Sequence, residues 1–383
     1  MGKTIRVLHL LKTTAGAAWA VKLLREQVAL GIEVHVVLPD ACGNAKAYED
    51  NGCKLHYLNV DLAVGKPWLN VSKICALRTI VKNILPDIVH SHFVSTTLIM
   101  RMAMIGITTP RIFQVPGPLH LEHKFFRSIE LLLSNRSDHW IGSCQWTVDK
   151  YLALGVHLNN VHLSYYGTDV DSFRSTSPSV LREQLCLSKD TIIISMVAYM
   201  YSPKYFLGQT RGLKGHEDLI DAVSIVRETH SNVHLVFVGG EWGGGTRYED
   251  NVMAYGKQKL ADNVTFLGNR KDVLNLYPSI DIAVFPSHSE NVGGAVESLL
   301  MKVPTITSDV GGFPDLVINQ KTGLTVPAKK PDLLASAIAY YMENMNKAKE
   351  HAIVGNELAR ELFDVKNTAK ETFQIYETIL TKK

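Results

Sequence analysis

The sequence predicts two α/β domains of similar size, each built on a doubly wound parallel sheet. Three observations carry this prediction. Short apolar runs of strand length alternate with stretches whose apolar residues recur at helical spacing. The connections between them are short, which is typical of parallel strands joined by helices that cover both faces of a sheet. A chain of 383 residues is also long enough for two domains of ordinary size.

The first half of the chain begins with an apolar run of strand length at residues 5–11. The helical pattern of residues 18–30 then stops at Gly31, a residue well suited to end a helix. The next apolar runs predict further strands, which lie at residues 33–38, 87–90 and 111–115.

A polar, turn-rich segment at residues 175–179 follows and is typical of a linker. The second half opens on the strongly apolar strand pattern of residues 191–197 and closes on a helical pattern at residues 367–380. Further strands are predicted at residues 233–238, 264–267, 280–285 and 305–307, a helix at 218–227, and a short hairpin or edge strand at 321–327.

These patterns divide the chain into three parts. We expect one domain at residues 1–170, a second at residues 171–365, and a last helix at residues 366–383 that crosses back to the first domain. Ligands are expected in the cleft between the two domains, where α/β proteins commonly bind them.

Composition and charge exclude several classes of protein. A formal net charge of +3 is too small to indicate nucleic acid as the main partner. The five cysteines form no CxxC motif, so we expect buried free thiols in a reducing cytosol and no zinc site. No apolar stretch reaches the ~18 residues of a membrane span, and no signal-peptide pattern is seen. We therefore expect a cytoplasmic protein that is soluble or at most peripheral on a membrane.

The most informative segment is the strand, loop and helix pattern of residues 285–300. The loop contains Gly293-Gly294, and glycines at such a turn let backbone amides approach a phosphate. Glu290 and Glu297 flank the glycines, and carboxylates beside an anion site accept hydrogen bonds from vicinal hydroxyl groups. Together they indicate a ligand that carries phosphate, ribose and sugar.

The same order of motifs continues downstream. The relevant residues are Pro286-Ser287, Glu290, Gly293-Gly294, Glu297, Val303-Pro304, Gly311-Gly312, and Gly323-Leu324 followed by Pro327. This series resembles the GT-B-fold, retaining, nucleotide-sugar-dependent glycosyltransferases of family 4, over nearly the whole chain. The resemblance implies two Rossmann-like domains facing across a cleft. It also implies that residues 1–170 bind the acceptor and residues 171–365 bind the nucleotide sugar.

The resemblance assigns donor contacts around the two glutamates. Glu297 is similar to the residue that binds the ribose hydroxyls, and Glu290 to the residue near the donor hexose. Six residues separate them here, where the family usually has seven. The backbone amides expected to face the donor sugar and phosphate are those of Asn291, Val292, Gly293 and Gly294.

The family also places an arginine and a lysine on the donor diphosphate. Lys214 matches the lysine, but Tyr199 stands where the arginine is expected, and Arg211 is the candidate to replace it. Two cations suit a diphosphate leaving group that gains negative charge in the transition state. Gly240 and Arg270 complete the expected donor-binding set, and no metal or other cofactor is expected.

The first half carries the remaining candidates. Gly16 resembles part of the family's glycine-rich loop, and His92 ends a strand motif of the family on the acceptor side. Pro116 occupies the position where the family frequently has a histidine that touches the donor sugar. His120, the preferred candidate, or His123 is expected to substitute for it on the acceptor side.

Two further features complete the sequence picture. Asp169-Val170-Asp171 has the spacing of a metal-binding DxD motif, but it lies in a segment similar to the family's interdomain turn. Basic and aromatic residues gather at residues 66–82 and 123–127, which would suit contact with an anionic membrane, although ordinary solvated helix faces are the favoured explanation.

The expected activity is retaining transfer of a sugar, with UDP-sugars the favoured donors, to a hydroxyl of a glycan or lipid-linked oligosaccharide in bacterial cell-surface polysaccharide synthesis. Two alternatives stay open: a nucleotide-sugar epimerase of the same fold, which would turn over without an acceptor, and a non-catalytic paralogue that binds nucleotide sugars. A dinucleotide-dependent dehydrogenase is disfavoured, because no GxGxxG follows the first strand.

Overall fold

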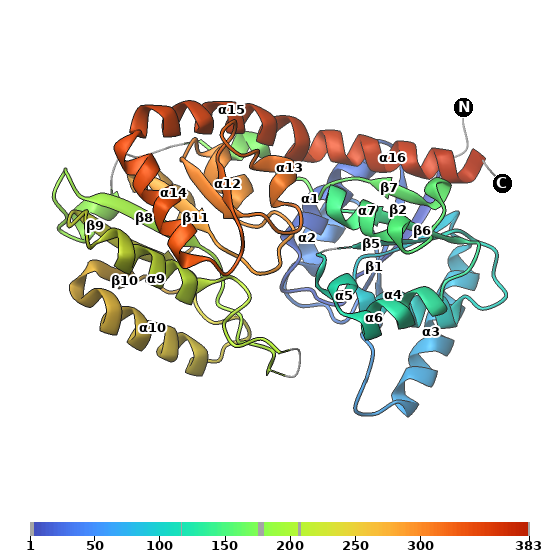
Figure 1. Cartoon of the computed structure of the whole chain (residues 1–383). Coiled ribbons are helices and arrows are strands. Elements are labelled where there is room, and N and C mark those ends of the chain that lie inside the picture. The colour runs from blue at the N-terminus through green and yellow to red at the C-terminus, as the bar shows by residue number, and fades with distance from the viewer. Residues whose placement is uncertain (1–3, 116, 175–179, 206–207, 382–383) are drawn as a thin grey trace. The chain divides into compact units, whose positions relative to one another are not determined.

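The computed structural model describes residues 4–115, 117–174, 180–205 and 208–381. The chain separates into two compact units (Figure 1). The first unit comprises Met1–Asp169 together with Leu362–Lys383, and the second comprises Val170–Glu361. Each unit is an α/β structure built on one parallel sheet.

The sheet of the first unit has seven strands within the described residues, in the order β3-β2-β1-β4-β5-β6-β7. Its strands are β1 Arg6–Leu10, β2 Glu33–Leu38, β3 Lys54–Tyr57, β4 Ile88–Ser91, β5 Arg111–Val115, β6 Asp138–Gly142 and β7 Val161–Leu163. Its helices are α1 Ala18–Ala29, α2 Ala45–Asp50, α3 Trp68–Ile84, α4 Val94–Ala103, α5 Leu119–Glu122, α6 Lys124–Leu132, α7 Gln145–Ala153 and α16 Val365–Thr381.

The sheet of the second unit has six strands in the described part of the chain, in the order β10-β9-β8-β11-β12-β13. Its strands are β8 Ile192–Val197, β9 Val233–Val238, β10 Val264–Phe266, β11 Ile282–Phe285, β12 Thr305–Ser308 and β13 Leu324–Val326. The helices are α8 Val180–Gln184, α9 His216–Val226, α10 Arg247–Leu260, α11 Val273–Leu276, α12 Ala295–Leu300, α13 Phe313–Leu316, α14 Pro331–Glu343 and α15 Met345–Phe363.

The central strands are buried on both faces, which explains their continuous apolar sequences. In β9 every residue from Val233 to Val238 is buried, and the four central residues of β8 are buried as well. The edge strand β13 is only three residues long and pairs in parallel with β12. The pattern at residues 321–327 therefore folds as the edge strand and not as the hairpin, the two forms that the sequence left open.

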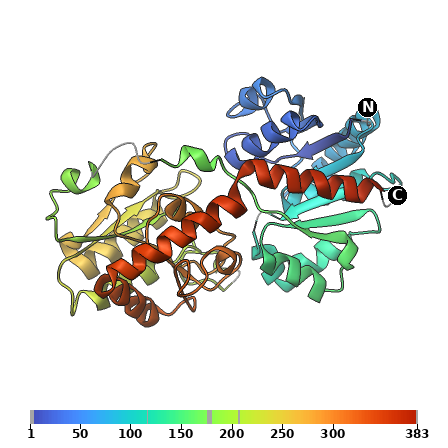
Figure 2. The same cartoon turned by 90° about the horizontal axis from the view of Figure 1, so that it is seen from above.

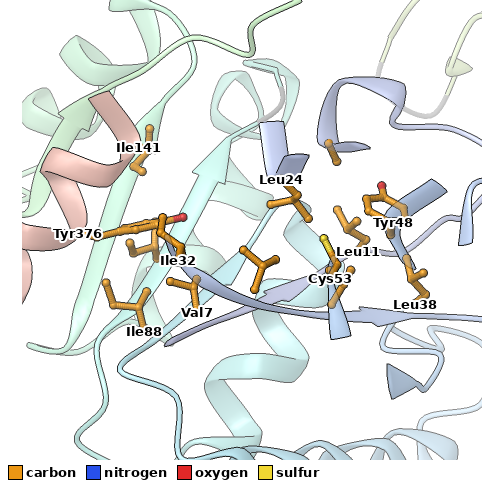
Figure 3. Packing of buried hydrophobic residues seen from close by; sticks show 14 of the residues in the cluster. Val7, Leu11, Leu24, Ile32, Leu38, Tyr48, Cys53, Ile88, Ile141 and Tyr376 are labelled. Atoms are coloured by element: carbon orange, nitrogen blue, oxygen red, sulfur yellow. The ribbon is translucent and has the colours of Figure 1, made fainter. Parts of the chain in front are cut away.

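The last helix, α16, packs on the first unit. Ile375, Tyr376 and Ile379 belong to a hydrophobic cluster with residues of β1, β2 and α1, among them Val7 and Leu24 (Figure 3). Figure 2 shows α16 lying along this unit, beside α1, which it contacts extensively. The apolar face that the sequence predicts for this helix is the face that it buries.

The order of strands reverses once in each sheet, and this positions the candidate site. In the first unit the reversal lies between β1 and β4, and in the second between β8 and β11. Loops that leave the carboxyl ends of such strands diverge to opposite faces and leave room for a ligand. The loops that carry Gly16, His92, Lys214 and Glu290 all follow these four strands.

The cysteines correct one expectation. All five are free thiols, but only Cys53 and Cys144 are buried. Cys42, Cys75 and Cys186 are exposed, because each lies in a loop or on an outward helix face and not in an apolar run. Within the described residues, no helix is both long enough and apolar enough to span a bilayer.

Candidate functional site

The loops at the switch point of the second unit bring a lysine and a glutamate together. Lys214 ends the loop that follows β8, and Glu290 lies in the loop that follows β11. The Lys214 ammonium and the Glu290 carboxylate form an ion pair across a sequence separation of 76 residues. Their side chains are only 16% and 11% exposed, so one positive and one negative charge stand poorly solvated at this edge of the sheet.

The Glu290 carboxylate is held from its own loop as well. The backbone N–H of Asn291 donates to Oε1 at 3.0 Å, and the Ser287 hydroxyl donates to Oε2 at 3.4 Å. The Glu290 carbonyl accepts from the backbone N–H of Gly312 at 3.3 Å. The Asn291 amide is therefore engaged by Glu290, and the neighbouring Val292 is buried.

Gly215, the residue after Lys214, is a glycine because its backbone packs tightly against Pro286. Gly215 has φ +74°, and a Cβ there would lie 2.2 Å from the Pro286 carbonyl oxygen. Only glycine combines this conformation with this contact. Gly215 therefore lets the start of α9 pack directly on the end of β11, and so brings Lys214 near Glu290.

Backbone conformation and tight packing also explain the two glycines Gly293 and Gly294. Gly293 has φ +42°, and a Cβ at Gly294 would lie 2.7 Å from the Val197 carbonyl oxygen and 2.6 Å from the Phe285 ring. The loop thus rests on the ends of both switch-point strands. Gly293 also packs against the Glu290 carboxyl group, so neither glycine leaves room for a side chain of its own. The approach of this backbone to a ligand stays a prediction.

Glu297 lies in the first turn of α12 and is positioned by a tyrosine that sequence reasoning missed. The Tyr277 hydroxyl donates to Glu297 Oε2 at 3.3 Å, and the Tyr277 side chain is fully buried. Burial, together with the Glu297 charge, raises the pKa of Tyr277 well above its usual value, so the hydroxyl stays protonated as a donor. The twenty-residue separation left no local signal for this contact.

The structure places Arg211 in an ion-pair network on α9. Its guanidinium contacts the Asp218 carboxylate and, at 2.7 Å, the Asp221 carboxylate. Asp218 also binds the His288 ring from the loop after β11. Burial opposes the charge of Arg211, but hydrogen bonds to the two aspartates outweigh it and raise the pKa of Arg211 further. Its charge is thus already balanced by two carboxylates.

Aromatic rings surround the position where the family has its arginine. Tyr199 is 46% exposed, and its ring meets the Trp242 ring edge to face at a centroid distance of 5.0 Å. The Trp242 ring also stacks on Tyr201 at 6.0 Å, and Lys214 Nζ lies 5.6 Å from the Tyr201 centroid. Sequence reasoning missed Tyr201 and Trp242, whose only signal is an aromatic enrichment near the two glycine-rich loops.

Gly240 and Arg270 lie on the loops after β9 and β10. The Gly240 N–H donates to Asn269 Oδ1 at 2.9 Å, which joins the two loops. Arg270, the next residue, makes a two-pronged contact with Asp272, at 2.8 Å and 2.6 Å. Arg270 is therefore paired within its own loop in this structure.

In the first unit, Gly16 lies in the loop between β1 and α1. Its carbonyl accepts from Asn44 Nδ2 at 3.3 Å, and its N–H donates to the Thr13 hydroxyl at 3.3 Å. The next residue, Ala17, takes the left-handed conformation with φ 58°. The loop therefore makes a tight turn without the family's second glycine.

His92 has no exposed surface in this structure. Its Nε2 lies 3.0 Å from His9 Nδ1, and its Nδ1 lies 3.3 Å from the Tyr166 hydroxyl. Burial lowers its pKa well below the usual value, so the ring is neutral at pH 7. An acceptor could reach this side chain only after the surrounding residues move.

His120 and His123 differ in their surroundings. His120 lies in α5, its Nε2 is 3.3 Å from the Tyr151 hydroxyl, and burial lowers its pKa to about 4. His123 joins α5 to α6, and its ring lies 5.0 Å from the Phe126 ring. Pro116, at the position expected for the family's histidine, lies outside the described residues.

The two aspartates of the DxD segment pair with different arginines. Asp169 binds Arg25 at 2.5 Å within the first unit, and Asp171 binds Arg360 at 3.3 Å within the second. Each carboxylate thus has a structural partner of its own, which agrees with the interpretation of this segment as a turn.

Family models match both units. The glycosyl transferases group 1 model matches residues 204–356, and the glycosyl transferase 4-like domain matches residues 15–167. The chain belongs to the group 1 glycosyltransferase family. The family predicted from the motifs is confirmed.

A D-inositol 3-phosphate glycosyltransferase of Mycobacteroides abscessus is 30% identical to this glycosyltransferase over 185 residues. The match covers 46% of this chain and 38% of the relative. The chain thus spans less than half the length of the curated relatives it matches.

Solved structures show the fold. HepE of Anabaena, solved in complex with UDP-glucose, has a TM-score of 0.79 at 20% identity, over 98% of this chain and 100% of HepE. Sucrose-phosphate synthase of Thermosynechococcus elongatus has a TM-score of 0.77 at 18% identity, over 99% and 100% of the two chains. The predicted GT-B fold, with two Rossmann-like domains, is confirmed.

Proposed function

We propose that this glycosyltransferase moves a sugar from a nucleotide donor, with UDP-sugars as the preferred class, to a hydroxyl of an acceptor. The ion pair between Lys214 and Glu290 carries the proposal, because it sets a cation and a hydrogen-bond acceptor side by side at the switch point. The fold similarity to HepE, which was solved with UDP-glucose, supports UDP as the nucleotide.

The donor would exchange the ion pair for its own contacts. The Lys214 ammonium turns to the diphosphate, whose charge grows as the bond to the sugar breaks. The Glu290 carboxylate then accepts hydrogen bonds from hydroxyls of the donor sugar. Because both charges are poorly solvated, a donor that satisfies only one of them leaves the other unpaired at a substantial cost. This coupling favours a ligand that carries both diphosphate and sugar.

Glu297 is proposed to bind the ribose hydroxyls, with Tyr277 fixing its orientation. Backbone amides of residues 292–294 are proposed to face the diphosphate, as the family resemblance implies. Lys214 supplies the charge at the leaving group in this scheme, and no metal is required. Added Mg²⁺ or Mn²⁺ is then expected to leave the rate unchanged, and a strict requirement for either ion would overturn this part.

The proposal does not depend on Arg211 or on the three candidate histidines of the first unit. The charge of Arg211 is already paired with Asp218 and Asp221, so we assign the main diphosphate contact to Lys214. Gly16, Gly240, Arg270, His92, His120 and His123 remain predictions from the family resemblance.

Retention of configuration is proposed on family membership, with the departing phosphate accepting the proton of the acceptor hydroxyl. The test is the anomeric configuration of the product, read by NMR from its ¹H coupling constant. An α-linked product from an α-donor supports retention, and a β-linked product contradicts it.

The acceptor is proposed to be a glycan or lipid-linked oligosaccharide of bacterial cell-surface polysaccharide synthesis. Exposed apolar side chains beside basic residues support contact with an anionic membrane. Trp68 on α3 is 66% exposed and Phe125 on α6 is 61% exposed. Lys66 lies two residues before Trp68, and Lys124 directly precedes Phe125. Flotation with phosphatidylglycerol vesicles, lost in Trp68→Ser with Phe125→Ser, tests this contact. Equal flotation of the variant would overturn it.

The function itself is tested by a thermal-shift panel of UDP-, GDP- and ADP-sugars, followed by turnover of the best binder with and without acceptors. Stabilisation by UDP-sugars and transfer only with an acceptor support the proposal. Isomerisation of the donor alone would identify an epimerase, and binding without turnover a non-catalytic paralogue. No stabilisation by any nucleotide sugar would contradict donor binding altogether.

A further inference from the structure

Three histidines meet inside the first unit, on the face of the sheet that carries α1 and α16. His9 lies on β1, opposite His90 on β4, and His92 follows two residues after His90. Side chains of paired residues, and of residues two apart on a strand, share one face of a sheet. The strand register therefore forces the three imidazoles together, and all three are fully buried.

The ring nitrogens are close enough to share one ion. His9 Nδ1 lies 3.0 Å from His92 Nε2, and one ligand nitrogen from each of the three rings lies within 4.8 Å of the others. Among the described residues, no other group of three or more His, Cys, Asp or Glu side chains brings its possible ligand atoms this close together. His90 Nε2 is buried and makes no hydrogen bond within the described structure. A buried polar atom of this kind calls for an explanation.

The second nitrogen of two rings is already occupied. His90 Nδ1 lies 2.6 Å from the Tyr376 hydroxyl, and His92 Nδ1 lies 3.3 Å from the Tyr166 hydroxyl. Histidines that bind metals use their other nitrogen in this way, since the hydrogen bond fixes the ring and its tautomer. His9 Nδ1, His90 Nε2 and His92 Nε2 remain as the converging set.

We propose that His9, His90 and His92 form a binding site for one divalent transition-metal ion of the class that prefers imidazole, such as Zn²⁺ or Co²⁺. Imidazole ligands select these ions over Mg²⁺ and Ca²⁺. Burial keeps all three rings neutral, as metal ligation requires, and lowers the pKa of His9 to about 3. Through Tyr376 the ion would link the sheet to α16. The ion-binding role of His92 replaces the acceptor-side role predicted for it from the family resemblance, and the site can be tested without the proposed sugar transfer.

The test uses the full chain without a histidine tag, loaded with Zn²⁺ or Co²⁺ during refolding and then desalted. We expect one metal ion per chain by elemental analysis, and a higher Tm than that of metal-free protein. The Co²⁺ form is expected to show the intense visible bands of a tetrahedral nitrogen site. Metal content at background, or only the weak bands of octahedral Co²⁺, would overturn the proposal without reference to any variant.

Variants then locate the ion. His9→Gln, His90→Gln and His92→Gln are each expected to lose the metal and its contribution to Tm. The matched control is His35→Gln with His56→Gln, because these rings also stack across neighbouring strands, with Nδ1 and Nε2 2.9 Å apart, but belong to no such group of three. The control is expected to keep the metal. Loss of the metal from the control variant would contradict the assignment of the ion to His9, His90 and His92. Retention of the metal by folded His9→Gln and His92→Gln would contradict it as well.

Discussion

Lys214 and Glu290 form a largely buried ion pair at the carboxyl edge of the second sheet. Both residues lie in loops and not in a helix or strand, because Lys214 precedes α9 and Glu290 follows β11. Gly215 and Pro286 bring the two loops into contact, and Gly293 packs against the Glu290 carboxyl group. The pair is thus a product of backbone packing at the switch point.

Gly215→Ala is expected to disturb the loop that carries Lys214. The left-handed conformation alone costs about 1–2 kcal/mol for a residue with a Cβ, and the Cβ would also meet the Pro286 carbonyl at 2.2 Å. Gly243→Ala is the matched control, since Gly243 has φ +96° and open space around it. Urea unfolding should show a larger loss for Gly215→Ala, with a fall in kcat/KM that Gly243→Ala lacks. Equal losses in both variants would mean that the contact is unimportant.

Arg211→Gln is expected to reduce stability more than activity. The change leaves Asp218 and Asp221 without their shared cation, in a setting where such a loss costs about 1–3 kcal/mol. The effect on kcat/KM should be much smaller than that of Lys214→Gln. The measurements are urea unfolding and donor saturation kinetics. If stability is unchanged and kcat/KM falls as far as in Lys214→Gln, Arg211 is the diphosphate ligand after all.

Tyr277→Phe is expected to raise KM for the donor about tenfold, because a hydrogen bond to a charged group contributes about 1.5–3 kcal/mol. The kcat value should change little, since Glu297 is proposed to bind the ribose and not to contact the reacting bond. Tyr341→Phe is the control, a buried tyrosine of the same unit whose hydroxyl lies 2.9 Å from His351. A fall in kcat with unchanged KM would argue against the role given to Glu297.

Stability of the metal-free protein is expected to fall as pH drops below 6.5. The unfolded chain binds protons on His9, His90 and His92 near that pH, whereas burial lowers their pKa values in the folded protein, to about 3 for His9. The native state thus binds fewer protons than the unfolded state. Each such histidine therefore lowers the free energy of unfolding by about 1.4 kcal/mol per pH unit below 6.5. Urea unfolding at pH 7.5 and 5.5 measures the slope, which His9→Gln should flatten. An unchanged slope would show that His9 protonates equally in both states.

Much of the fold could be predicted from the sequence, because the buried strands of a parallel sheet are mostly apolar. β2, β5 and β9 fall on their predicted residues. No strand was predicted for β3, an edge strand of mixed polarity, or for β6. In β6, Asp138 is buried beside Arg101 and Arg111, so charge balance replaces the apolar pattern.

The candidate site was less predictable. The motifs predict Lys214, Glu290 and Glu297 as site residues, because these lie at fixed spacings from glycines and prolines. They could not reveal that Arg211 is engaged by aspartates of α9, or that Tyr277 holds Glu297. Contacts of this kind depend on how distant loops pack, and a single sequence carries no signal for them.

The role of Lys214 and Glu290 is tested most directly by the affinity for UDP, measured by calorimetry. Lys214→Gln should weaken UDP binding at least about tenfold, because an ionic hydrogen bond to phosphate is lost. Glu290→Gln should bind UDP as tightly as the native protein or more so, since it frees Lys214, while transfer falls about 10²-fold or more. Lys257→Gln, at an exposed site on α10, is the control. UDP binding that is unchanged in Lys214→Gln would contradict the account.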